Sequence, residues 1–239
     1  MVVNAENLGY KEINEALRSG EKEYIVNGVL GQRFIAAGMA NKYITVTGTP
    51  GNALGAYLNG AKVIVKGNAQ DAVGDTMNSG EIIVHGNAGD TVGYAMRGGS
   101  IYIKGDAGYR AGIHMKAYKE KVPVMVIGGK AGSFLGEYQA GGVIIVLGLG
   151  ADNKNIVGNF PCTGMHGGKM FLRADHTGVT FPKQVTARAA DKSDLKEIEK
   201  YISQYCKLFG ADKKAVMNSP FTVVTPDSKN PYKQLYVAN

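Results

Sequence analysis

Glycine recurs at a fixed interval through the middle of this chain of 239 residues. Each of two glycine series advances by 19 residues, and the second series follows the first by seven: Gly48, Gly67, Gly86 and Gly105, then Gly55, Gly74, Gly93 and Gly112. A fixed period of about 20 residues is typical of a solenoid, in which each repeat forms one coil. Because a residue without a Cβ turns sharply at low cost under a neighbouring coil, we expect these glycines at the corners.

Each repeat opens with a short run that is rich in β-branched residues. In the copies at 62–80 and 81–99, valine and isoleucine alternate with lysine, glutamate or histidine. Such alternation over four or five residues indicates a half-buried strand. No helical pattern of ten or more residues separates one run from the next, which argues against βαβ units. We therefore predict an all-β fold, a parallel β-helix of about seven coils whose strands stack about 4.8 Å apart.

Equivalent side chains of successive coils should form ladders along the stack. Two series stand out, one three residues after the second glycine and one just after the first: Leu58, Met77, Met96 and Met115, and Asn68, Asn87 and Asp106. We expect the flexible thioethers to fill an interior corner. We expect the Asn and Asp side chains to bond the backbone of their own turn in a left-handed conformation.

The repeat divides the chain into three segments. Residues 1–23 are expected to form an N-terminal cap helix that ends at Gly20 and shields the first coil. Residues 24–180 are expected to form the β-helix domain. Residues 181–239 are expected to form a C-terminal helix and an extended arm.

The C-terminal helix is predicted over residues 193–210. Ser193 is the expected N-cap, apolar residues follow at helical spacing, and Gly210 closes the helix. The prolines among the remaining residues favour an extended arm, which either packs along the solenoid or reaches a partner.

Composition excludes several classes of function. The net charge is +7, yet no basic run carries interleaved aromatics, so solubility or an acidic protein partner explains the charge better than nucleic acid. No apolar run approaches the roughly 20 residues of a membrane span, and no secretory signal opens the chain, so we expect a cytoplasmic protein. Cys162 and Cys206 form no CxxC pattern, which argues against an iron-sulfur or zinc site on this chain.

The glycine period is disturbed at two places. Gly105 to Gly128 is a step of 23 residues and Gly148 to Gly158 a step of ten, where the other copies give 19 and seven. Insertions in solenoids usually fall on loops of one face, which is often the binding face. We predict that a protein interface lies there, formed by these residues: His114, Lys116, Glu137, Tyr138 and His166.

Catalytic and metal sites are weakly supported by the same residues. A metal site built from His114, His166 and Glu137 lacks an HxH or HxxxH spacing. Ser133 and Cys162 lack the context of a nucleophile, such as GxSxG. We therefore predict no catalytic, cofactor-binding or metal-binding residue on this chain.

With its residues laid out, the repeat resembles the GXGXG domain of glutamate synthases, the right-handed parallel β-helix at the carboxyl end of the large subunit. Residues 89–116, 126–148 and 164–168 carry the likeness, which covers roughly residues 24–173 and looks like the stand-alone form of this domain. A scaffold subunit of formylmethanofuran dehydrogenase is similar in the same coils. The insertion after GIHMK and the copy FLGEYQAGG favour the synthase.

This resemblance implies a structural subunit of an oxidoreductase, without an active site of its own. In the family, a glutaminase with an N-terminal cysteine releases ammonia, and a barrel carrying FMN and an iron-sulfur cluster converts 2-oxoglutarate to glutamate. In this chain Val2 follows Met1, so removal of Met1 would expose a valine and not a nucleophilic cysteine. We expect an assembly subunit that docks the glutaminase and FMN-binding synthase subunits and can also form a homo-oligomer.

Two alternatives stay open. One is the scaffold subunit of a formylmethanofuran dehydrogenase, as the likeness in the same coils implies. The other is an independent hydrolase that uses loop residues around His114, Glu137 and His166.

Overall fold

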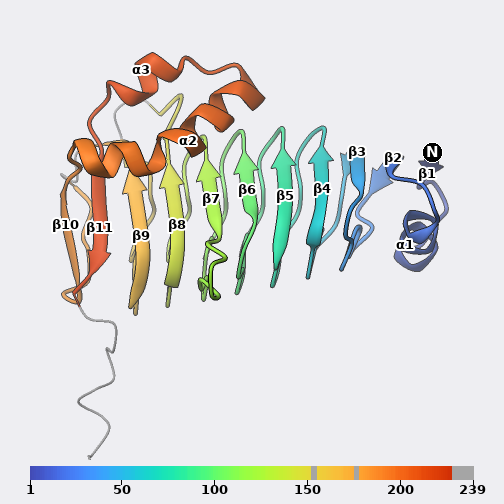
Figure 1. The fold of residues 1–239 in the computed structure, drawn as a ribbon, viewed down its shortest axis with the longest axis horizontal. Coiled ribbons are helices and arrows are strands. Elements are labelled where there is room, and N and C mark those ends of the chain that lie inside the picture. The colour runs from blue at the N-terminus through green and yellow to red at the C-terminus, as the bar shows by residue number, and fades with distance from the viewer. Residues whose placement is uncertain (152–154, 175–177, 228–239) are drawn as a thin grey trace, which may run out of the picture.

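The computed structural model describes residues 1–151, 155–174 and 178–227, and in them a single, mostly parallel sheet winds into a rod (Figure 1). The strands β1 to β9 pair in chain order, each parallel to the next. Their bounds are Val2–Asn4, Glu23–Leu30, Tyr43–Thr49, Asn59–Val65, Ser79–Val84, Ser100–Ile103, Val124–Ile127, Ala140–Val146 and Gly167–Leu172. The predicted all-β parallel β-helix is confirmed, with about eight turns where the glycines indicate about seven.

The strand register follows the sequence period. Tyr43 pairs with Lys62, Lys62 with Glu81, and Glu81 with Ser100, each a step of 19 residues. The next step, from Ser100 to Val124, is 24 residues, because residues 117–123 form a loop. The backbone N–H of Gly129 accordingly donates to the carbonyl of Gly105 at 2.8 Å.

Two corner assignments from the sequence are therefore wrong. Gly129, and not Gly128, is the equivalent of Gly105. In the last coil Cys162 occupies the second corner that the sequence assigns to Gly158, with a φ of 61° and its N–H bonded to the carbonyl of Leu135. The glycine spacing misled here because an insertion moved the corner to a residue that is not glycine.

The interior of the rod is filled by ladders. Each strand from β3 to β9 turns two apolar side chains inward, as Ile82 and Val84 do in β5. The predicted methionine ladder is confirmed, since its members are fully buried: Leu58, Met77, Met96 and Met115. Gln139 takes the next rung and Met165 the one after it.

The segment after each strand alternates between right-handed and left-handed backbone. Every second residue has a positive φ over three positions, for example Arg110, Gly112 and His114 at 55°, 71° and 55°. The equivalent positions of neighbouring coils behave alike: Ala53, Gly55 and Tyr57; Ala72, Gly74 and Thr76; Thr91, Gly93 and Ala95; Phe134, Gly136 and Tyr138. The second glycine series thus relieves backbone strain.

The first glycine series is required mostly by close approach. Gly86 and Gly105 have no positive φ, but a Cβ there would overlap the Oδ1 atoms of Asn68 and Asn87. These side chains hold the coils together. Asn68 Oδ1 accepts from the N–H of Asn87 at 2.8 Å, Asn87 Oδ1 from that of Asp106 at 2.8 Å, and Asp106 Oδ1 from that of Lys130 at 2.6 Å.

The expectation that this ladder bonds its own turn is wrong. Each side chain reaches the next coil, and none of Asn68, Asn87 and Asp106 has a positive φ. The reason is the spacing of the coils, which brings the N–H of the following coil within reach of a short amide or carboxylate.

The N-terminal end is closed by a strand and a helix. The helix α1 (Tyr10–Arg18) buries Ile13 and Leu17 against the first coil, as the cap prediction requires. The C-cap of the helix is Ser19 rather than Gly20. The strand β1 was not predicted from the sequence. Three residues are too short a run for alternation to reveal a strand.

The C-terminal end is closed by antiparallel strands. The strand β11 (Thr222–Pro226) lies between β9 and β10 (Val185–Ala189), antiparallel to both. Part of the predicted arm is therefore sheet, and residues 228–239 lie outside the described residues. In the part of the chain that the structure describes, no helix is long and apolar enough to cross a membrane.

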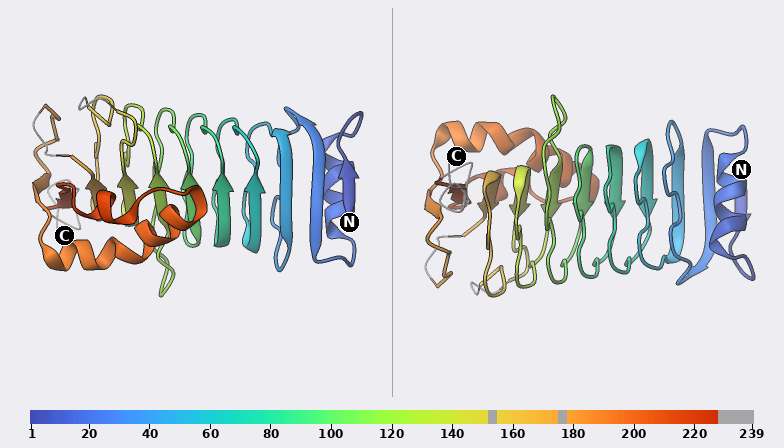
Figure 2. Two further views of the ribbon diagram at one scale, coloured as in Figure 1. Left: turned by 90° about the horizontal axis from the view of Figure 1, so that it is seen from above. Right: turned by 90° about the horizontal axis from the view of Figure 1, so that it is seen from below.

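In the sequence, α2 (Lys192–Phe209) and the short α3 (Lys213–Met217) come between β10 and β11. They cover one outer face of the sheet (Figure 2). Gly210 ends α2 in a left-handed conformation, as predicted. The N-cap is Asp191 rather than Ser193, because its carboxylate accepts from the N–H groups of Ser193 and Asp194.

Candidate functional site

Four of the five predicted interface residues line one hollow of about 430 Å³ on the surface of the rod. His114 and Lys116 come from the coil after β6, Tyr138 from the coil after β7, and His166 from the coil after β8. The coil after β5 contributes two more side chains, which the sequence did not single out: Tyr94 and Arg97. The hollow is thus shared by four successive coils.

The left-handed backbone sets the direction of the aromatic side chains. His114 and Tyr138 occupy the third left-handed position of their coils, with φ of 55° and 53°. Stacking of the coils brings their rings to 5.2 Å with an interplanar angle of 9°. The ring of Tyr94 meets His114 edge-on at 5.9 Å. These three rings form a continuous aromatic wall.

The charged groups of the hollow are all basic. Arg97 and Lys116 are exposed, and each lies four residues after the second glycine of its coil. The imidazole of His166 is fixed by a contact of 2.9 Å between its Nδ1 and the carbonyl of Gly164. Among the described residues, no carboxylate lines the hollow. Two permanent cations and two imidazoles beside aromatic rings suit an anionic group.

Glu137 does not line this hollow. The residue is buried, with 8% exposure, and its carboxylate accepts from Arg110 Nε at 2.8 Å. The guanidinium of Arg110 also lies 5.1 Å from the ring centre of Phe134. Glu137 and Tyr138 are neighbours in the sequence but point in different directions. The sequence therefore grouped two residues that the backbone separates.

The two side chains considered as nucleophiles in the sequence, Cys162 and Ser133, lack the surroundings of one. Burial raises the pKa of the Cys162 thiol to about 12, so it stays protonated, and its Sγ lies 3.6 Å from Met170 Sδ. Ser133 Oγ accepts from the N–H of Asn159 at 2.9 Å. Neither side chain is hydrogen-bonded to a histidine within the described ranges. Among the residues with described positions, no three His, Cys, Asp or Glu side chains are grouped to hold a metal ion.

The residues that the sequence missed were partly visible in the repeat. Arg97 and Lys116 share one repeat position, so the basic pair could have been found by aligning the coils. Gln139 carries no such signal. It lies behind the hollow in the methionine ladder, donates to the carbonyls of Gly141 and Gly142, and leaves its Oε1 buried with no partner among the described atoms.

Comparison with known proteins agrees with the coil geometry. A family model described as the GXGXG motif matches residues 12–227. The chain belongs to the GXGXG motif family. A relative in Methanocaldococcus jannaschii, described as an uncharacterized protein, is 43% identical over 250 residues, which cover 99% of this chain and 96% of the relative.

A similar fold occurs in a solved complex. A chain of the formyltransferase/hydrolase complex of Methylorubrum extorquens, crystallised with methylofuran, matches with a TM-score of 0.64. The match covers 87% of this chain and 75% of that one, at 20% identity. At this identity the likeness shows a common fold.

Proposed function

We propose that this GXGXG chain is the non-catalytic structural subunit of a multi-chain glutamate synthase. The observation that carries the proposal is the basic, aromatic hollow shared by four coils, which offers groups that can bind the acidic and planar side chains of a partner. Stacked coils restrain one another, so such a surface is a rigid platform. Carboxylates of a partner subunit would bind Arg97 and Lys116, and an aromatic or planar group would pack on His114 and Tyr138.

The chemistry would lie on the partners. A glutaminase subunit would release ammonia, and a synthase subunit would hold FMN and the iron-sulfur cluster. This chain would hold the two subunits in a fixed arrangement in the cytoplasm, and carry no cofactor itself. That division is supported by the resemblance of the repeat to the domain of glutamate synthases.

Reconstitution tests this proposal. The chain is co-expressed with the glutaminase and flavin-dependent synthase subunits of its own organism, and a tag on this chain is used for purification. We expect both partners to copurify, and glutamine-dependent formation of glutamate to fall when this chain is omitted. Failure of both subunits to associate would overturn the proposal.

A charge reversal tests the hollow itself. We expect Arg97→Glu combined with Lys116→Glu to weaken the association by about tenfold or more, because buried like charges would face each other. Lys207→Glu is the matched control, because it reverses an exposed lysine on α2 away from the hollow. Equal affinity of the two variants would remove the hollow as the docking surface.

A second candidate is a scaffold subunit of a formylmethanofuran dehydrogenase. The observation that favours it is the shared fold with a chain of a formyltransferase/hydrolase complex. In this case the tagged chain would copurify with subunits of a formyl-transferring complex and leave the glutaminase unbound.

A further inference from the structure

An apolar row runs along the outer face of the sheet from β1 to β11, and Arg188 of β10 lies beside its last member. It is formed by one outward residue of each of these ten strands, and the strand register places them side by side: Val2, Ile25, Thr45, Ile64, Ile83, Tyr102, Val126, Ile145, Phe171 and Val223. Thr45 is its one polar member. An outward sheet face that meets water normally carries polar side chains at such positions.

The helix α2 covers part of this row. Its residues Ile198, Ile202 and Tyr205 form one buried cluster with the outward residues from Tyr102 to Phe171. Its last turn reaches β5, where Phe209 packs edge-on against His85 at 5.3 Å. From Ile83 onward the row is buried, with Ile83 at 1% exposure.

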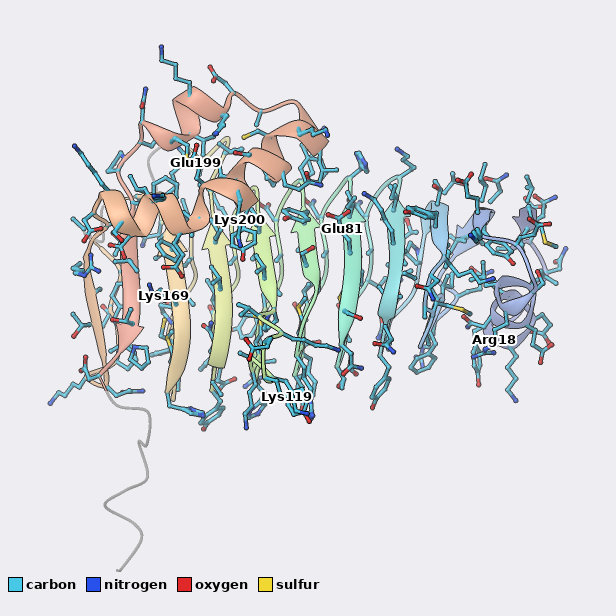
Figure 3. All side chains as sticks on the ribbon, viewed as in Figure 1. Arg18, Glu81, Lys119, Lys169, Glu199 and Lys200 are labelled. Carbon is cyan, nitrogen blue, oxygen red and sulfur yellow. The ribbon has the colours of Figure 1, made fainter. Side chains whose placement is uncertain are left out.

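The cover stops before the row does. Val2 is 58% exposed and Ile25 44% exposed, and Ile64 and Thr45 are half-buried. Glu81 marks the boundary, since one carboxylate oxygen accepts from Gln204 of α2 at 3.3 Å and the other from Lys62 at 2.6 Å (Figure 3). The strands β1 to β4 therefore present an apolar row with nothing over it in the described residues.

The uncovered part of the row is bordered mainly by cations. A hollow of about 450 Å³ beside it is lined by Lys22, Lys42 and Lys62, with Glu81 as its acidic residue. On the other side of the row lies exposed Lys66, which forms no ion pair within the described part of the chain. Within β2 and β3, Glu23 is the one acidic residue. The border therefore favours a partner with acidic side chains.

We infer that the outer face of β1 to β4 binds an amphipathic helix of a partner subunit, with acidic residues along its edges. The helix lies on Val2, Ile25 and Ile64 as α2 lies on Tyr102, Val126 and Ile145. Three strand spacings of about 4.8 Å correspond to about ten helical residues, or three turns. This inference rests on the proposed function, because the helix belongs to a subunit that the chain assembles.

Photo-crosslinking in the reconstituted complex tests the inference. A benzophenone amino acid replaces Ile64 in one variant and Lys207, on the exposed side of α2, in the control. The crosslinked peptides are identified by mass spectrometry. We expect Ile64 to crosslink to a helical partner segment with apolar residues three and four apart and flanking Asp or Glu, and Lys207 not to reach that segment.

Two substitutions measure the contribution of the face. We expect Ile25→Asp to weaken assembly by about tenfold or more, because it places a carboxylate in an apolar contact. Lys66→Glu should weaken it by about threefold, and Lys66→Arg should retain the affinity. The circular dichroism spectrum and thermal midpoint of the isolated chain should stay unchanged in all three variants.

The outcomes separate this inference from the proposed function. Association of both subunits with crosslinks from Ile64 to a second copy, to residues 228–239 of the same chain, or to no protein overturns the inference alone. A complex of unchanged affinity with Ile25→Asp also overturns it. If neither subunit associates, the proposed function fails as well.

Discussion

The two halves of the outer sheet face have the same origin in the repeat but opposite surroundings. Over β5 to β9 the apolar row is buried, mostly beneath α2, whereas over β1 to β4 comparable side chains are exposed or half-buried. The interior does not differ in this way, because inward residues are buried in both halves. The comparison teaches that the repeat specifies the rod, while the segments outside the repeat decide which surfaces of the rod stay available.

The largest difference should come from truncating one residue in each half. Phe171→Ala should cost about 3–5 kcal/mol of unfolding free energy, because it opens a cavity beneath α2. Ile25→Ala should stay within about 0.5 kcal/mol in the isolated chain, since Ile25 already contacts water. Urea unfolding followed by circular dichroism measures both. Similar losses in the two variants would break the comparison.

Alkaline pH should act on the covered half. Burial at the contact between α2 and the sheet raises the pKa of Tyr102 and of Tyr205 to about 12 from an ordinary value of 10.0. Folding thus favours the neutral phenols, so their stabilising contribution is complete below pH 10 and is lost as the pH rises from 10 to 12. The urea midpoint should fall over this window, and absorbance at 295 nm should show tyrosines that ionise near pH 12.

The matched control for this titration is Tyr205→Phe. The variant loses the hydrogen bond from the Tyr205 hydroxyl to the carbonyl of Lys104 and should show a weaker dependence on pH between 10 and 12. An unchanged dependence would mean that the contact between α2 and the sheet does not protect the phenol of Tyr205.

The side-chain ladder at the first corner should not distinguish the two halves. Asn68→Ala leaves the N–H of Asn87 without its acceptor, and Asp106→Ala does the same to Lys130. Each should cost about 0.5–1.5 kcal/mol. Thermal unfolding of both variants compares the coil after β4 with the coil after β6. A cost for Asp106→Ala more than twice that for Asn68→Ala would show that α2 also stabilises this edge.

The smallest effect should locate the boundary of the cover. Ile83→Val should cost about 0.5–1.5 kcal/mol, because Ile83 is buried, with 1% exposure. Ile64→Val, one strand further along, should cost less because Ile64 is half-buried. Differential scanning calorimetry resolves the pair. An equal cost would mean that the cover extends to β4.

The sequence predicts the rod well because the rod is periodic. The glycine interval, the alternation within each copy and the methionine series are repeated, so each coil supports the interpretation of the next. Four of the five interface residues also lie together, since insertions and the coil spacing bring His114, Lys116, Tyr138 and His166 to one hollow.

The errors concern single events that no repeat supports. Cys162 stands at a corner where glycine is expected, and Glu137 turns away from its neighbour Tyr138 to pair with Arg110. The antiparallel strands β10 and β11 lie outside the repeat, so no second copy supports their prediction. They pair with each other although they are far apart in sequence. Whether α2 covers five strands or nine depends on helix length and docking, which local sequence patterns do not encode.

The loop at residues 117–123 has a consequence for how such a molecule can change. Tyr118 and Lys121 close the loop by mutual backbone hydrogen bonds, and it projects sideways while Ser100 and Val124 stay paired (Figure 2). Extra residues thus enlarge one coil without moving the neighbouring coils. The rod acts as a ruler with divisions of about 4.8 Å. Two binding surfaces on it keep their separation, counted in coils, however much the loops between them are rewritten.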